Sequence, residues 1–250
     1  MDHYEELANQ YRMIYDHHTH TVYSHGKGTI EDNVRVAAAK GLRSIAITDH
    51  GPGHMTYGID MSKIGEMRDE IKRLSGIYPQ VEVLLGVEAN TIRNAPYIDL
   101  TEEEKEELDI VLAGYHYGIR NAGCVANYLY QHAGLFHGET SDLKVKNTAM
   151  ILDVLYHNKI DVLTHPGDKG PFDIYDIARA CQDTGTLMEI NMKHAHLTIE
   201  EIKISAQFDV DFIIGSDAHV PEKVGEFKGS LIRALKAGLD PARIVNIEKR

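Results

Sequence analysis

The feature that most constrains the fold is the alternation of short apolar runs with segments of helical periodicity along the chain. The periodic segments repeat apolar residues every three or four positions, as at Ile30, Val34 and Ala37, where a helix is predicted to end near Gly41. Short β-branched runs are typical of buried parallel strands. Seven such runs occur, at residues 12–20, 43–48, 81–87, 108–115, 160–164, 186–191 and 210–215. Seven strand-helix units predict a parallel, barrel-like α/β fold.

Length and charge restrict the class of protein. The 250 residues are 43% hydrophobic and contain no Pro-rich or Ser-rich linker, which predicts one domain spanning residues 1–250. The formal net charge is -12, and Lys and Arg do not cluster. Nucleic acids and anionic membranes are therefore disfavoured as partners, because both require clustered positive charge.

Cysteine usage and the first residues bear on the cellular compartment. Cys124 and Cys181 are far apart in sequence and form no C-x-x-C motif, so no disulfide framework is indicated. The opening residues lack the basic start and apolar core of a signal peptide, and no run reaches the length of a membrane span. We expect a cytoplasmic protein that does not enter a membrane.

Histidines and carboxylates follow almost every predicted strand. In the first run His18 and His20 are two positions apart, so on an extended strand they share one face. Later strand ends carry Thr48-Asp49-His50-Gly51, Gly86-Val87-Glu88-Ala89-Asn90, Gly114-Tyr115-His116, Thr164-His165-Pro166-Gly167 and Gly215-Ser216-Asp217-Ala218-His219. The carboxyl ends of parallel barrel strands meet at one rim. Convergent imidazoles and carboxylates there predict a metal site.

These motifs, in this order, resemble those of the PHP (polymerase and histidinol phosphatase) family of metal-dependent phosphoesterases. The resemblance extends from His18-Thr19-His20 to Ser216-Asp217-Ala218-His219 and so covers nearly the whole chain. Within the family, the chain is most similar to the small single-domain phosphatases. It implies a distorted (β/α)7 barrel with three divalent metal ions at the C-terminal rim of the strands.

The resemblance also implies which residues bind each ion. His18 and His20 would hold the first ion with Glu88 and Asp217, and Glu88 would bridge to the second. The remaining ligands would be His116 and His165 on the second ion, and His25, His50 and His219 on the third.

The residue types favour the same chemistry independently of the family. Imidazole suits zinc, iron and manganese, so zinc is the first expectation, with iron or manganese as alternatives. No thiolate belongs to the set, which argues against a closed structural zinc site. Open positions would hold water, and a metal-bound water ionises near neutral pH to give a hydroxide that attacks a phosphoester. We therefore assign Glu88 and Asp217 to catalysis, with His54 as a candidate acid for the leaving alkoxide.

Further candidates lie beside these motifs. Asp16 and Asp49 precede ligand histidines, where each could orient an imidazole or cap a turn. His194 is a second candidate acid, although the pair His194-Ala195-His196 resembles a surface segment before a helix. Four basic residues shortly after strand ends could bind the substrate: Arg93, Arg120, Lys169 and Lys193.

The expected activity is hydrolysis of a small phosphomonoester, such as a histidinol-phosphate-like or other phosphorylated metabolite. Two alternatives stay open: a nuclease or proofreading phosphodiesterase, which the charge of -12 disfavours, and an amidohydrolase-type C-N hydrolase, which usually bridges its metals with a modified Lys. Residues 118–141 lack clear periodicity and are a candidate lid. A homo-oligomer is compatible with the sequence.

Overall fold

The core of the protein is a parallel sheet of seven strands that follow one another in sequence order. The computed structural model describes residues 3–120, 122–133 and 142–250. The strands are β2 (Tyr15–Asp16), β3 (Ser44–His50), β4 (Glu82–Asn90), β5 (Ile110–Gly114), β6 (Val162–Leu163), β7 (Leu187–Glu189) and β8 (Phe212–Ile213), and each pairs in parallel with the next. The sheet curls into a distorted barrel, which confirms the predicted fold class.

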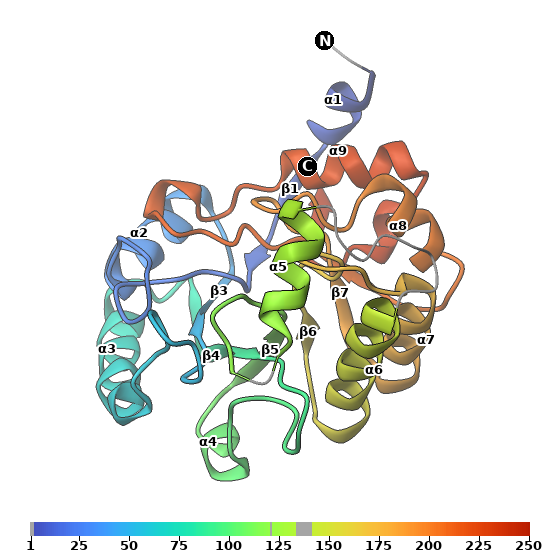
Figure 1. The fold of residues 1–250 in the computed structure, drawn as a ribbon. Helices are drawn as coiled ribbons and strands as arrows, with labels where there is room; N and C mark the ends of the chain where they lie inside the picture. Colours follow the sequence, from blue (N-terminus) through green and yellow to red (C-terminus); the bar gives the residue numbers. More distant parts are fainter. Residues whose placement is uncertain (1–2, 121, 134–141) are drawn as a thin grey trace.

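Helices surround this sheet (Figure 1). They are α1 (His3–Ala8), α2 (Ile30–Lys40), α3 (Ile64–Ile77), α4 (Glu102–Glu106), α5 (Cys124–Ala133), α6 (Asp142–His157), α7 (Ile174–Thr184), α8 (Ile199–Ser205) and α9 (Lys228–Ala237), with 3-10 turns at Met61–Lys63, Pro221–Lys223 and Pro241–Arg243. α2 ends where predicted, since Gly41 adopts a left-handed φ of 73°. None of the helices within the described ranges is long and apolar enough to cross a membrane.

The gap between β2 and β8 is closed by the side chain of Asn246. Its Oδ1 accepts from the Ile214 N–H at 3.0 Å, and its Nδ2 donates to the carbonyls of Tyr15 and Ile214. At the opposite end, Thr19 and Ala218 form an isolated parallel bridge. The Asp16 carboxylate of β2 also accepts from the Ser216 N–H. These separate contacts take the place of a strand-to-strand ladder between β2 and β8, and the barrel is distorted there.

The first predicted strand differs from the structure. The run 12–20 is not one strand: β1 (Tyr11–Met13) pairs antiparallel with β9 (Ile247–Lys249), and only β2 joins the barrel. The chain from Pro241 forms a short 3-10 turn followed by β9. The first predicted strand is divided because β9, from the last residues of the chain, pairs with β1.

Strand alternation decides which side chains enter the barrel. On β3, Ala46 packs with Leu112 and Val162 in the interior, whereas Ile45 and Ile47 pack in the layer beneath the helices. By the same period of two, His50 points inward at the rim and Asp49 points outward. Glu88 of β4 enters the barrel in the same way and is fully buried.

Candidate metal centre

Glu88 lies at the centre of a ring of imidazoles. Its Oε1 is 3.0 Å from His165 Nε2, 3.3 Å from His116 Nε2 and 3.4 Å from His18 Nε2. Its Oε2 is 2.9 Å from His50 Nδ1. One carboxylate therefore touches histidines from four separate parts of the rim, through both of its oxygens.

Gly114 makes room for this carboxylate. A Cβ at this position would lie 2.9 Å from Glu88 Oε1 and 2.3 Å from Thr164 Oγ1. The Thr164 hydroxyl donates to the same oxygen at 2.7 Å. The end of β5 is thus shaped around Glu88.

Asp217 is the second carboxylate of the cluster. Its Oδ1 lies 3.3 Å from His20 Nε2, 3.8 Å from His18 Nε2 and 3.2 Å from His219 Nδ1. Asp217 and His165 are non-glycine residues with positive φ, 50° and 30° respectively. Such backbone strain is concentrated at functional sites.

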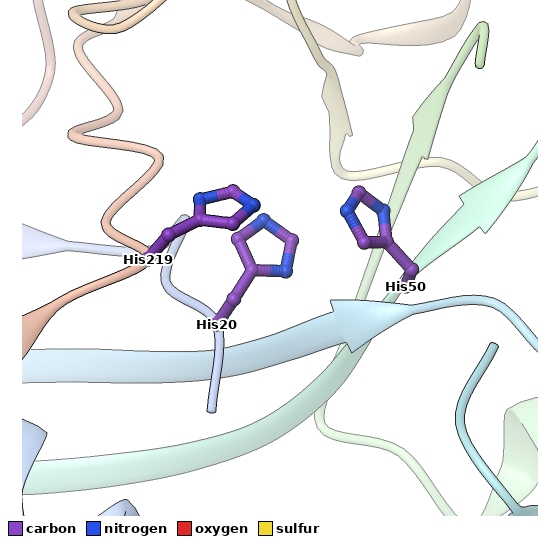
Figure 2. Close-up of side chains that lie close together, drawn as sticks. All are labelled: His20, His50 and His219. Atoms are coloured by element: carbon purple, nitrogen blue, oxygen red, sulfur yellow. The ribbon is translucent and has the colours of Figure 1, made fainter. Parts of the chain in front are cut away.

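A group of three histidines lies beside Asp217 (Figure 2). The ring of His20 lies between those of His219 and His50, with centroid separations of 4.3 and 4.4 Å. The ring of His25 is 4.2 Å from that of His219 and 4.9 Å from that of His50. The structure thus brings all nine residues predicted as ligands to one place.

The donors fit divalent ions. Four sets of three have ligand atoms within 4.8 Å of one another: His20, His50 and His219; His18, His20 and Asp217; His50, Glu88 and His116; and His165, His194 and Asp217. These sets share members and form one continuous cluster. Four buried atoms in it make no hydrogen bond among the described residues: His20 Nδ1, His50 Nδ1, Glu88 Oε2 and His116 Nε2. His50 Nδ1 and Glu88 Oε2 are 2.9 Å apart but are not aligned for a hydrogen bond. Unsatisfied buried donors and acceptors are rare unless an ion or water completes them.

The electrostatics of the cluster favour an ionised Glu88 and neutral rings of His20 and His25, whereas Glu189, Glu88 and Asp217 raise the pKa of His18 well above its usual value although burial opposes this. Although burial opposes its ionisation, Glu88 has a pKa well below the usual range because of His116 and His18. Burial and the nearby His50 lower the pKa of His20 well below its ordinary value. Burial and the neighbouring His219 and His50 lower the pKa of His25 to about 3. An ionised carboxylate and neutral imidazoles are the forms that coordinate cations.

His116 shows how a ring is oriented. The Asn90 amide nitrogen donates to Gly51 O at 3.1 Å and to Asp99 Oδ2, so its Oδ1 is left to accept from His116 Nδ1 at 2.8 Å. The proton of His116 is therefore on Nδ1, and Nε2 presents a lone pair toward Glu88. Such indirect support is typical of metal ligands.

Asp16 and Asp49 support the loops of the cluster. Asp49 accepts from the Thr21 N–H at 2.8 Å and from the Thr21 and Ser24 hydroxyls, within the loop that carries His25. Asp16 accepts from the backbone N–H groups of Ser216 and Gly225. None of these donors is an imidazole, so of the two roles left open by the sequence the geometry matches loop capping.

Of the predicted substrate residues, Lys169 and Lys193 line the pocket above the cluster. Lys193 Nζ is 3.1 Å from both ring nitrogens of His219, and Lys169 pairs with Asp168 at 2.8 Å. Arg93 and Arg120 are exposed and do not line this pocket.

His54 also lines the pocket, but its ring is engaged with the backbone. Its Nδ1 accepts from the N–H groups of Thr56 and Tyr57 at 3.3 Å, and it bonds the backbone of Tyr117. Its ring stacks on Tyr57 with centroids 4.1 Å apart. The role of His54 as an acid stays a prediction.

Two residues near the ligands were not singled out from the sequence, and a third was underestimated. Glu189 and Asn191, from the end of β7, are fully buried beside the cluster. The sequence carries a signal for them, because Glu189 and Asn191 lie at the end of the predicted strand 186–191, as the polar residues of the other rim motifs lie at the ends of their strands. His194, considered closer to a surface residue, lies with Nε2 3.3 Å from Asp217 Oδ2.

The candidate lid is only partly described. Residue 121 and residues 134–141 lie outside the described residues, whereas α5 occupies much of the remainder. Buried Asn127 of α5 exchanges amide hydrogen bonds with Asn147 of α6 and donates to the Tyr115 hydroxyl. These contacts attach α5 to the side of the rim that carries His116.

Comparison with known proteins identifies relatives along almost the whole chain. A sequence profile for the family described as "PHP domain" matches residues 16–216. A "Probable phosphatase" of Thermoanaerobacter sp. is 31% identical over 95% of this chain and 91% of its own length, and one of Shewanella sediminis is 29% identical over 94% and 90%. Among solved structures, the fold is similar to histidinol phosphate phosphatase from Lactococcus lactis complexed with zinc, L-histidinol and phosphate. That match has a TM-score of 0.64 and 18% identity, and it covers 91% of this chain and 95% of the other.

Proposed function

This chain belongs to the PHP domain family and is a metal-dependent phosphatase, and from that premise we propose that it hydrolyses a small phosphomonoester at a centre of three divalent ions. The observation that carries the proposal is the position of Glu88. Both of its oxygens lie 2.9–3.4 Å from imidazole nitrogens of four histidines. A carboxylate that bridges two cations requires this kind of two-sided arrangement of donors.

The nine residues of the cluster would hold the ions, with zinc as the favoured metal. His18, His20, Glu88 and Asp217 would hold the first ion, and Glu88, His116 and His165 the second. The third would have the ligands His25, His50 and His219. Divalent ions, when bound, acidify coordinated water and neutralise phosphate oxygens. The relative from Lactococcus lactis was solved with zinc, which supports this choice.

The residues of the chain itself would orient the substrate. Lys169 and Lys193 extend into the pocket from the loops after β6 and β7, and a dianionic phosphate between them would gain two charge-assisted hydrogen bonds. Local positive charge of this kind attracts a phosphate despite the net charge of -12. A histidinol-phosphate-like metabolite fits the proposal, since L-histidinol and phosphate are the ligands of the Lactococcus lactis relative.

Release of phosphate from a substrate panel tests the proposal. The zinc-loaded protein should hydrolyse a chromogenic phosphomonoester and at least one of a set of sugar, nucleotide and amino-alcohol phosphates, and a chelator should abolish turnover. Lys193→Ala should raise KM about tenfold or more, because a charged hydrogen bond contributes about 1.5–3 kcal/mol. Lys203→Ala is the matched control, since Lys203 on α8 pairs with Glu200 at the surface and lies outside the pocket.

Absence of turnover by fully loaded protein on the whole panel would refute the phosphatase assignment to a small substrate. Faster cleavage of a single-stranded oligonucleotide, with binding that weakens steeply as salt rises, would instead favour the phosphodiesterase alternative.

A further inference from the structure

Glu189 is a buried carboxylate with no place in the ligand set. It ends β7 and is fully buried. Its Oε1 lies 2.6 Å from Nδ1 of His18, and its Oε2 accepts from the His165 backbone N–H at 2.7 Å and from Asn191 Nδ2 at 2.9 Å. Burial of a carboxylate costs free energy unless its oxygens accept hydrogen bonds, and both oxygens of Glu189 do so.

The contact with His18 fixes which ring nitrogen carries the proton. An ionised carboxylate only accepts hydrogen bonds, so the proton between the two groups is on Nδ1 of His18. Nε2 is then the nitrogen that faces the cluster, where it is 3.4 Å from Glu88 Oε1 and 3.2 Å from His20 Nε2. Glu189 therefore orients His18 so that Nε2 is the nitrogen available to a metal ion.

The other oxygen of Glu189 reaches ligands on different strands. It holds the backbone of His165, whose φ of 30° is unfavourable for a residue with a side chain. Asn191, which donates to Glu189, also lies 3.3 Å from Asp217 Oδ2. One side chain thus connects ligands that follow β2, β6 and β8.

The neighbouring strand is shaped to admit this side chain. A Cβ on Gly215 would lie 1.9 Å from Glu189 Oε1 and 3.0 Å from His18 Cβ. Only glycine leaves the carboxylate in contact with the His18 ring.

We propose that Glu189 is a positioning residue that sets the tautomer of His18 and the orientation of His165, and thereby the affinity of the two ions that these ligands hold. The inference rests on the proposed metal centre. The third ion, held by His25, His50 and His219, should not depend on Glu189, because no contact of Glu189 described above reaches those residues.

Metal affinity of Glu189→Gln tests this. Gln has the shape of Glu but is uncharged and has only one side-chain oxygen. It therefore cannot accept hydrogen bonds from both His18 Nδ1 and the His165 N–H. Competition with a chelator should show two zinc ions bound about 10–100-fold more weakly and one bound as in the unmodified protein, which is the usual size of such an effect. Circular dichroism and a thermal melt verify that the variant is folded.

Glu201→Gln is the matched control. Glu201 also receives an imidazole, His196 Nδ1, at 3.0 Å, and the Thr198 N–H at 2.7 Å, but His196 is outside the cluster. The Glu201→Gln variant should bind all three zinc ions as tightly as the unmodified protein does. Equal weakening of all three ions in both variants would overturn the inference, because it would reveal only a general loss of structure.

A measurement on the unmodified protein covers the case in which Glu189→Gln does not fold. In the zinc-loaded protein, long-range nitrogen-proton NMR should find the proton of His18 on Nδ1. Zinc on Nδ1, or a protonated Nε2, would overturn the inference and leave the phosphatase proposal intact. Failure of the unmodified protein to bind zinc at all would instead refute the proposed metal centre.

Discussion

Replacing Asn246 by Ala should destabilise the protein because this buried side chain joins β2 to the end of β8. The change removes the acceptor of the buried Ile214 N–H and the donors to two carbonyls, those of Tyr15 and Ile214. Leaving a buried polar group unsatisfied costs about 1–3 kcal/mol, and carbonyls tolerate it better than N–H groups. We therefore expect a loss of about 3–6 kcal/mol, which is a large part of the 5–15 kcal/mol typical of a folded protein.

Urea denaturation of chelator-treated protein measures this loss without the contribution of bound metal. Asn158→Ala is the control, since Asn158 donates to the Pro96 and Val154 carbonyls but is only half-buried, so that water can replace it. That variant should lose less than about 1 kcal/mol. A loss for Asn246→Ala no larger than that of Asn158→Ala would show that the gap between β2 and β8 is closed by other means.

Three further substitutions test the centre and its surroundings. Glu88→Ala should remove more than one ion per chain, because a bridge supports two; unchanged metal content by elemental analysis would exclude bridging. Asp49→Ala should release the loop that carries His25 and reduce the metal content by about one ion, whereas full occupancy would show that this loop needs no support from Asp49. Gly215→Ala should cost about 1–3 kcal/mol in urea unfolding, the usual range for overpacking, because the added Cβ would lie 1.9 Å from Glu189 Oε1. Stability equal to that of the unmodified protein would contradict the close contact.

The fold was predictable where the signals are local. The helix that ends at Gly41 depends on residues within a few positions, and it ends as predicted. Closure by Asn246 was not predictable, because its partner Tyr15 is 231 residues away in sequence.

α5 was missed for a different physical reason. Its apolar residues Val125 and Tyr128 are 76% and 54% exposed, whereas the polar Asn127 is buried. The pattern of an amphipathic helix is therefore inverted on this element, and the periodicity that reveals other helices fails there.

The residues around the ligands show why sequence neighbours are poor guides to support on a barrel strand. Asp49 precedes His50, and successive side chains of a strand point to opposite faces, so Asp49 cannot reach the ring beside it and instead holds the loop of Thr21. The carboxylate that does reach a ligand ring, Glu189, is 171 residues from His18 in sequence. On this rim the ligands were predictable as residue types at strand ends. The residues that orient these ligands come from other strands, so predicting them requires the register of the whole sheet.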